Sequence, residues 1–119
     1  MTIPNDIDIF KGDDGEFECT VKDRDGNIVD LTGAKIYVYV NVSVKDITIN
    51  PIIEKANSDG GGGDSEILIQ TPATNGKFDL FIDAADTTNE DAGEYRYKAK
   101  VDLGGKLKTI ISSVFNIEE

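Results

Sequence analysis

Apolar and polar residues alternate with a period of two along most of the chain. Successive side chains of a strand point to opposite faces, so this alternation predicts strands with one buried and one solvated face. The clearest run has apolar residues at every second position from 36 to 44, opposite Tyr37 and Tyr39. Shorter runs occupy 16–22, 78–83 and 94–103, and the last run, 107–117, is partly apolar on both faces. The pattern predicts an all-β protein.

Clusters of Gly, Asp and Asn separate the runs and predict turns. Residues 23–27 (Asp-Arg-Asp-Gly-Asn) predict one hairpin turn, and Gly-Gly within 103–106 predicts a tight hairpin between the last two strands. Pro51 predicts an edge position for the strand near it. Residues 57–65 contain four consecutive glycines and predict a flexible loop, since no Lys-Ser/Thr pair follows to make a phosphate-binding loop.

About seven to nine short strands in a chain of 119 residues favour a two-sheet antiparallel β-sandwich. A small closed barrel is the alternative architecture. The length has room for one core, so we expect a single domain over 1–119.

The charge balance narrows the range of partners. The chain has 23 acidic and 12 basic residues, a formal net charge of -11. Such a surface repels phosphates and anionic lipid headgroups, so we expect neither nucleic acid nor a membrane as partner. Solubility alone would also explain the acidity. The first six residues lack the basic and apolar regions of a signal peptide, so either the protein stays where it is made or the sequence begins after a removed leader.

The residue inventory argues against catalysis. Histidine is absent, which removes the usual acid/base near neutral pH and the commonest zinc ligand. The single cysteine, Cys19, excludes an intrachain disulfide. No nucleophile, base and orienting group share a recognisable spacing, and Asp79 and Asp83 flank Phe81 as one exposed strand row. We therefore expect no enzymatic activity, no catalytic residues and no cofactor.

A weak candidate for a metal site lies in the first hairpin turn. Asp23, Asp25 and Asn27 have the spacing that opens many calcium loops. A full loop of that type needs a carboxylate at its twelfth position, which is Ala34 here. We therefore favour a β-turn and expect no metal.

Two tyrosines form a candidate contact surface. Tyr37 and Tyr39 lie on the polar face of the predicted central strand. Aromatic residues on such a face are typical of protein contact surfaces. They would equally serve to cover the edge of the core, and the sequence leaves both interpretations open.

The stretch Asp91–Tyr97 (Asp-Ala-Gly-Glu-Tyr-Arg-Tyr) resembles the D-x-G-x-Y-x-C sequence of immunoglobulin-like domains. The resemblance implies that Tyr95 is the corner tyrosine, whose hydroxyl bonds to backbone upstream. It also places Cys19 at the first cysteine of the usual disulfide and Tyr97 at the second. The implied fold is an immunoglobulin-like sandwich with no disulfide, in which Tyr97 fills the vacated volume.

A wider resemblance covers most of the chain. The run 23–34 (D-x-D-G-x-x-V-D-L-T-G-A), together with 9–13, 76–78 and 92–97, resembles immunoglobulin-like modules of phage virion proteins. That family includes the N-terminal domain of baseplate upper proteins in phages of Gram-positive bacteria. The long glycine-rich middle departs from the family pattern.

The phage resemblance implies a non-enzymatic structural module of a tail, baseplate or head decoration. Such a module would be made in the host cytoplasm and located in the virion. Its partners would be other virion proteins or further copies of itself, so an oligomer is possible. The alternative is a cell-surface or secreted adhesion module that recognises a glycan or protein through its loops.

Overall fold

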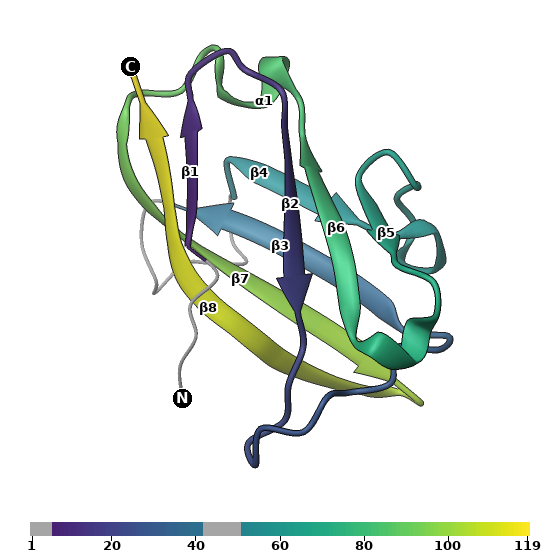
Figure 1. Ribbon diagram of the computed structural model, residues 1–119. Helices are drawn as coiled ribbons and strands as arrows, with labels where there is room; N and C mark the ends of the chain where they lie inside the picture. The colour runs from purple at the N-terminus through teal and green to yellow at the C-terminus, as the bar shows by residue number, and fades with distance from the viewer. Residues whose placement is uncertain (1–5, 42–50) are drawn as a thin grey trace.

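The computed structural model describes residues 6–41 and 51–119. Eight strands are present in this part of the chain, and they form two packed layers (Figure 1). Their bounds are β1 (Ile7–Phe10), β2 (Gly15–Thr20), β3 (Lys35–Asn41), β4 (Ile53–Ala56), β5 (Ile67–Ile69), β6 (Lys77–Ile82), β7 (Gly93–Leu103) and β8 (Lys106–Glu118). One α-helical turn, α1 (Ala84–Thr87), and two 3₁₀ turns, η2 (Ser58–Gly60) and η3 (Ala73–Asn75), lie in the connections.

The larger sheet has the strand order β1-β8-β7-β3-β4, and the smaller has the order β2-β6-β5. The predicted all-β sandwich is confirmed. Every strand pair is antiparallel except β1–β8, where Ile7 lies opposite Phe115 in a parallel register. This parallel edge pair is a detail that the alternation pattern did not predict. Alternation determines which side chains face inward, but it does not determine the direction of the neighbouring strand.

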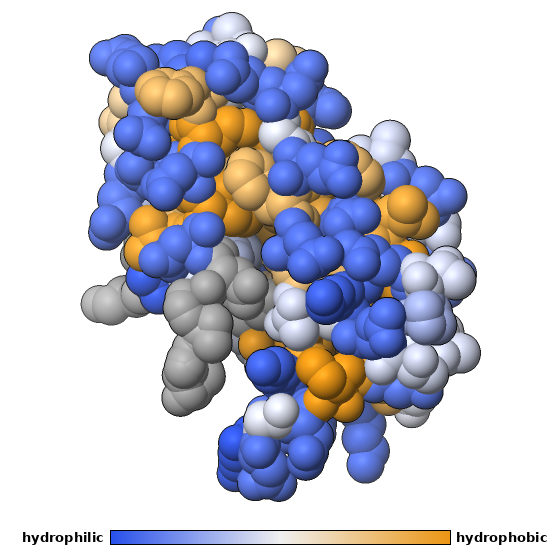
Figure 2. Space-filling model, in the orientation of Figure 1, coloured by the Kyte–Doolittle hydropathy of each residue, from blue (hydrophilic) through white to orange (hydrophobic). Residues whose placement is uncertain are grey.

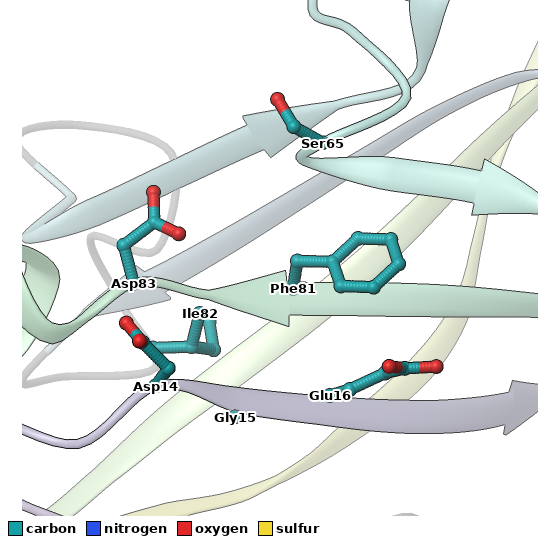
Figure 3. A pocket seen from close by; sticks show the side chains of 7 residues that line it. All are labelled: Asp14, Gly15, Glu16, Ser65, Phe81, Ile82 and Asp83. Atoms are coloured by element: carbon teal, nitrogen blue, oxygen red, sulfur yellow. The ribbon is translucent and has the colours of Figure 1, made fainter.

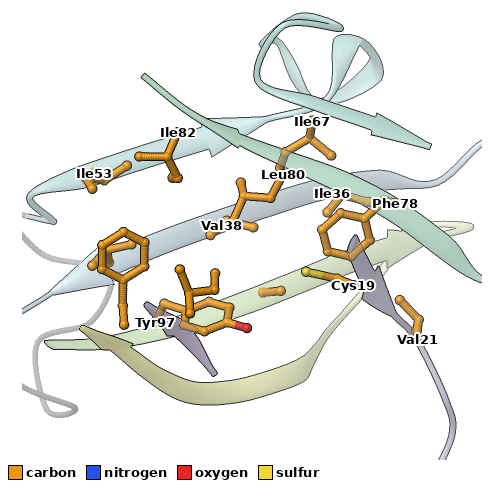
Figure 4. Packing of buried hydrophobic residues seen from close by; sticks show 14 of the residues in the cluster. Cys19, Val21, Ile36, Val38, Ile53, Ile67, Phe78, Leu80, Ile82 and Tyr97 are labelled. Carbon is orange, nitrogen blue, oxygen red and sulfur yellow. The ribbon is translucent and has the colours of Figure 1, made fainter. Parts of the chain in front are cut away.

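The core lies between the inner faces of the two sheets (Figure 4). Ile36, Val38 and Val40 of β3 are fully buried, as their alternation predicted, while Val42 and Val44 lie outside the described residues. Other strands contribute every second residue in the same way, and the largest of these buried side chains are Tyr97, Phe78, Phe115, Ile7, Ile67, Leu80, Ile82 and Ile117. Tyr97 and Phe115 meet edge to face, with ring centroids 6.4 Å apart.

A β-bulge accounts for Ile110 in the two-faced apolar pattern of the last run, whereas Val114 faces outward opposite Arg96. Ala99 lies opposite Ile111 and Lys100 opposite Thr109, so Ile110 is an extra residue in β8. Ile110 is half-buried and packs against the core. The bulge changes which alternate residues face inward, and Leu107 beyond it is 55% exposed.

The predicted hairpin turns form. Asp23 N donates to Asn27 O at 2.8 Å, and Gly26 takes a φ of 86°. Gly104 and Gly105 connect β7 to β8 with φ values of 61° and 86°. Two central residues with positive φ characterise the type I′ turn that suits the twist of a hairpin.

The buried side-chain amide of Asn57 joins the glycine-rich loop to the start of β3 by hydrogen bonds. Asn57 is 4% exposed, and its Oδ1 accepts hydrogen bonds from Ile36 N at 2.9 Å and Gly60 N at 3.1 Å. Its Nδ2 donates to Ala34 O at 2.9 Å. The glycine-rich loop folds back on this residue, since Gly62 N donates to Asn57 O, and a Cβ on Gly62 would lie 2.0 Å from Ala56 O. The predicted flexibility of residues 57–65 stays a prediction.

Replacing Asn57 tests this arrangement. We expect Asn57→Ala to lower the free energy of unfolding by about 3 kcal/mol, because it leaves buried backbone groups without partners. Urea unfolding followed by circular dichroism measures the change. The control is Asn75→Ala on exposed η3, which should change stability by less than about 0.5 kcal/mol. Equal effects of the two substitutions would contradict the role of Asn57.

A charged side chain points inward from an edge strand. β4 is an edge of the larger sheet, as Pro51 predicted, and Lys55 lies opposite the core residue Val38. The Lys55 side chain is 7% exposed, and its Nζ lies 2.7 Å from Asp86 Oδ2 and 3.8 Å from Asp83 Oδ2. Asp86 also accepts from Asp83 N at 2.8 Å, which caps α1. The ion pair links the β4 edge to α1. An inward-pointing charge on an edge strand also opposes pairing with a strand of another molecule.

Substitutions of Lys55 and of Asp86 should lower the free energy of unfolding by different amounts. Asp86→Ala leaves Lys55 nearly buried with its nearer partner removed, so we expect a loss of about 3 kcal/mol. Lys55→Met replaces the cation with an apolar chain of similar size and should cost less than about 1 kcal/mol. Chemical unfolding of both variants measures the order. A larger loss for Lys55→Met would overturn this account.

Cys19 and Tyr97 point into the core from opposite sheets (Figure 4). Burial, with smaller contributions from Asp79 and Glu18, raises the pKa of the Cys19 thiol to about 12. Burial also raises the pKa of Tyr97, and proximity to Cys19 adds to the rise. Both groups are therefore neutral core residues at physiological pH.

Thiol labelling measures the burial of Cys19. A rise in pKa from 9.0 to about 12 lowers the thiolate fraction at pH 8 about 1000-fold. We therefore expect the native protein to react with a disulfide reagent at least about 100-fold more slowly than the same protein in guanidinium chloride. Native and unfolded rates within tenfold of each other would show that Cys19 is not held in the core.

Candidate functional site

The predicted contact residues Tyr37 and Tyr39 lie on the outer face of the larger sheet. Both are half-buried. The register of β3 and β7 places Tyr37 opposite Lys100 and Tyr39 opposite Lys98. Arg96 lies in the same outward row of β7, because Tyr97, Ala99 and Val101 face the core. We call this surface the aromatic–basic face; its residues are Tyr37, Tyr39, Arg96, Lys98 and Lys100.

The basic row is unusual in so acidic a chain. Three of the 12 basic residues stand on one face of one strand, between Glu94 and Asp102 in the same row. Within the described residues, the ion pairs involve Lys11, Lys55 and Lys77, so the basic row has no carboxylate within 4 Å. The Nε atom of Arg96 is buried and has no hydrogen-bond partner among the residues that the structure describes.

An open hollow of about 280 Å³ adjoins the tyrosines on the side of β4. Its lining consists of the two tyrosines, residues 54–56 of β4, the turn 60–62 and Glu66. A Cβ on Gly60 would come within 3.1 Å of the Tyr37 ring, so the loop supports that ring closely. Burial, followed by the nearby Glu54 and Tyr37, raises the pKa of Tyr39, which is therefore a neutral hydroxyl at pH 7.

The outer face of the smaller sheet has the opposite character. It carries Glu16, Glu18 and Asp79 beside the apolar Leu68 and Phe81, and we call these five residues the acidic face. Figure 2 shows hydrophilic side chains over β2 and β6, with apolar surface gathered between β1 and β2. The predicted exposed row Asp79–Phe81–Asp83 lies here, with Asp79 and Phe81 half-buried.

Two acids on this face are direct cross-strand neighbours. Glu18 lies opposite Asp79, an arrangement that costs stability because the charges repel. Gln70 Nε2 donates to both carboxylates, at 2.9 Å and 2.8 Å, and Lys77 Nζ lies 3.7 Å from Glu18. These contacts offset part of the repulsion and leave a net negative surface.

The acidic face continues into an open hollow of about 480 Å³ (Figure 3). Asp14, Glu16 and Asp83 approach it from β2 and the end of β6, and Phe81 forms part of its wall. Asp14 Oδ1 accepts a hydrogen bond from Ala84 N at 2.7 Å. The hollow suits a cationic group in chemical terms.

The weak metal candidates Asp23, Asp25 and Asn27 form a turn. Asp23 Oδ1 accepts hydrogen bonds from the backbone N–H groups of Asp25 and Asn27, both at 2.9 Å. The Asn27 hydrogen bond is the main cause of the lowered pKa of Asp23. Within 6–41 and 51–119, no group of three or more His, Cys, Asp or Glu residues is arranged to hold a metal ion.

Tyr95 lies near the start of β7. It is 7% exposed, and its hydroxyl donates to Asp91 O at 2.7 Å. This is the bond that the immunoglobulin resemblance implies for a corner tyrosine. Burial, followed by Glu90 and Asp91, raises the pKa of Tyr95, so the hydroxyl remains a donor at neutral pH. The bond fixes the start of the strand that carries the basic row.

Sequence reasoning missed the pairing of tyrosines with lysines. Alternation had placed Arg96, Lys98 and Lys100 on a solvated face, but it carried no signal for which strand lay beside it. The inward direction of Lys55 and the bridging role of Gln70 were also missed. Both depend on contacts between residues distant in sequence.

No described helix is long and apolar enough to cross a membrane. No family model matches the chain, and no curated protein matches it by sequence.

Among solved structures, the chain is similar to the N-terminal domain of phage TP901-1 ORF48. The TM-score is 0.55 at 12% identity, and the match covers 99% of this chain and 92% of that one. A putative glycoside hydrolase from Bacteroides vulgatus matches with a TM-score of 0.46 at 12% identity, over 93% of this chain and 16% of its own. The TM-score of the second match is too low to support a conclusion about this chain. The first shows a shared fold: the protein has the sandwich of a phage protein domain.

Proposed function

We propose that the protein is a non-enzymatic structural module of a phage particle, in a tail, baseplate or head decoration. The observation that carries the proposal is the fold likeness to a phage protein domain, which spans nearly the whole of both chains. The resemblance of residues 23–34 to baseplate upper protein N-terminal domains supports the same conclusion. On this proposal the protein is made in the host cytoplasm and resides in the virion.

The surfaces suit assembly with proteins. Half-buried tyrosines offer large contact area with a hydroxyl for a hydrogen bond, and they are enriched at protein interfaces. The aromatic–basic face joins two of them to cations that form no ion pair with any described residue. Other virion proteins or further copies of this chain are the proposed partners, whereas nucleic acid is disfavoured by the charge of -11.

The non-enzymatic part of the proposal rests on the residues around the two hollows. Carboxylates, tyrosines and glycines form most of their lining, and Ser65, Lys55 and a few apolar side chains complete it. The chain has no histidine, and its cysteine is buried. These side chains supply binding and no activated nucleophile.

The location in the particle is directly testable. We expect mass spectrometry of density-gradient-purified particles, from a host carrying the phage genes, to find the protein at a fixed ratio to the major capsid protein. A host cytoplasmic enzyme serves as the contamination control. Recovery of the protein at the host cell surface or in the medium, and not in particles, would contradict the proposal and favour an adhesion module.

Substitution of the tyrosines tests the surface. Tyr37→Ser/Tyr39→Ser should keep the melting temperature within a few degrees but lower the amount per particle, because both rings lie outside the main core. Ile28→Ser, at an exposed apolar residue in the first hairpin, is the control. Loss of folding in the tyrosine variant would assign the rings to the core, and unchanged incorporation would exclude them from the contact.

A further inference from the structure

The two outer faces of the sandwich complement each other. The larger sheet presents Arg96, Lys98 and Lys100 beside two tyrosines. The smaller sheet, on the opposite side, presents Glu16, Glu18 and Asp79. Each patch thus combines apolar area with charge, and the named charges are of opposite sign. Acids border the basic patch, at Glu54 beside Tyr39 and at Glu94 and Asp102 on β7, and Lys77 borders the acidic patch.

The charges also match in spacing. Lys98 and Lys100 are two residues apart on β7, and Glu16 and Glu18 are two residues apart on β2. Alternate residues of a strand lie about 6.7 Å apart on the same face. Two strands laid along each other therefore bring both cations to both carboxylates at once.

The apolar groups complete the match. Leu68 is 40% exposed and lies opposite Asp79, and Phe81 lies opposite Glu16. Tyr37 and Tyr39 lie beside the two lysines in the same way. Each charged pair thus has an apolar neighbour on its own face, the composition of an interface that removes both from water.

We propose that the aromatic–basic face of one copy docks on the acidic face of a second copy. The proposal rests on the proposed function and names the partner of that same surface. The two patches lie on opposite sides of the sandwich, so the contact is heterologous and each copy keeps one free face. Such a contact closes into a ring or continues as a stack.

Charge also selects against the symmetric alternatives. Two aromatic–basic faces would bring together the six cations of their β7 rows, which the bordering acids Glu54, Glu94 and Asp102 offset only in part. Two acidic faces would bring together carboxylates that already repel within one copy. Like charges across an interface oppose association and suppress wrong pairings. The heterologous pairing is the arrangement in which unlike charges meet.

Charge reversal on each face tests the proposal in purified protein. Sedimentation velocity of the wild type should show concentration-dependent association that weakens as NaCl rises from 50 to 500 mM. Lys98→Glu/Lys100→Glu and Glu16→Lys/Glu18→Lys should each weaken it at least about tenfold. An equimolar mixture of the two variants should associate again, because unlike charges meet at every contact between them.

The matched control is Lys106→Glu/Lys108→Glu. These lysines are exposed at the β7–β8 hairpin. Their reversal changes the net charge by the same amount as Lys98→Glu/Lys100→Glu does. It should associate as the wild type does, and melting curves confirm that all variants fold.

Three results would overturn the proposal: a wild type that stays monomeric at millimolar concentration, a mixture that does not associate, or a control that loses association equally. Association unaffected by Glu16→Lys/Glu18→Lys would instead show symmetric pairing through the larger sheet. The assay contains no phage particle. A negative result would therefore contradict docking between copies but would not contradict the proposed location in the virion.

Discussion

Packing between the two sheets holds this sandwich together without a disulfide. Tyr97 of the larger sheet and Cys19 of the smaller one both point into the space between them, and Phe115 meets the Tyr97 ring edge to face. The buried Tyr97 side chain is among the largest in this core. Because Tyr97 must face inward, Arg96 and Lys98 on either side of it must face outward. The core therefore determines which residues form the outer faces.

The periphery depends on a few polar contacts with buried partners. Asn57 joins the glycine-rich loop to the start of β3, Lys55 joins the β4 edge to α1, and Tyr95 fixes the entry to β7. Each contact satisfies a buried polar group that would otherwise be costly. Together they hold β3, β4 and β7, the strands around the aromatic–basic face. The same contacts therefore stabilise the β4 edge and position the strands of the aromatic–basic face.

Most strands and the two hairpins were predictable because they depend on local residues. Alternation located the inward residues of β3, and Gly26, Gly104 and Gly105 marked the turns that need positive φ. The parallel β1–β8 pair and the bulge at Ile110 could not be predicted from the sequence, because both depend on how distant strands meet. The candidate surface was half predictable: Tyr37 and Tyr39 were identified, but their lysine neighbours on β7 required the register.

The register of β3 and β7 is the central claim of this account, because a slip of one residue would turn the tyrosines into the core. Cross-strand nuclear Overhauser effects in solution test it most directly. We expect backbone contacts that pair Tyr37 with Lys100 and Tyr39 with Lys98, and inward pairs of Val38 with Ala99 and Val40 with Tyr97. A pattern shifted by one residue, with Tyr39 paired to Tyr97 or Ala99, would contradict both the core and the surface described above.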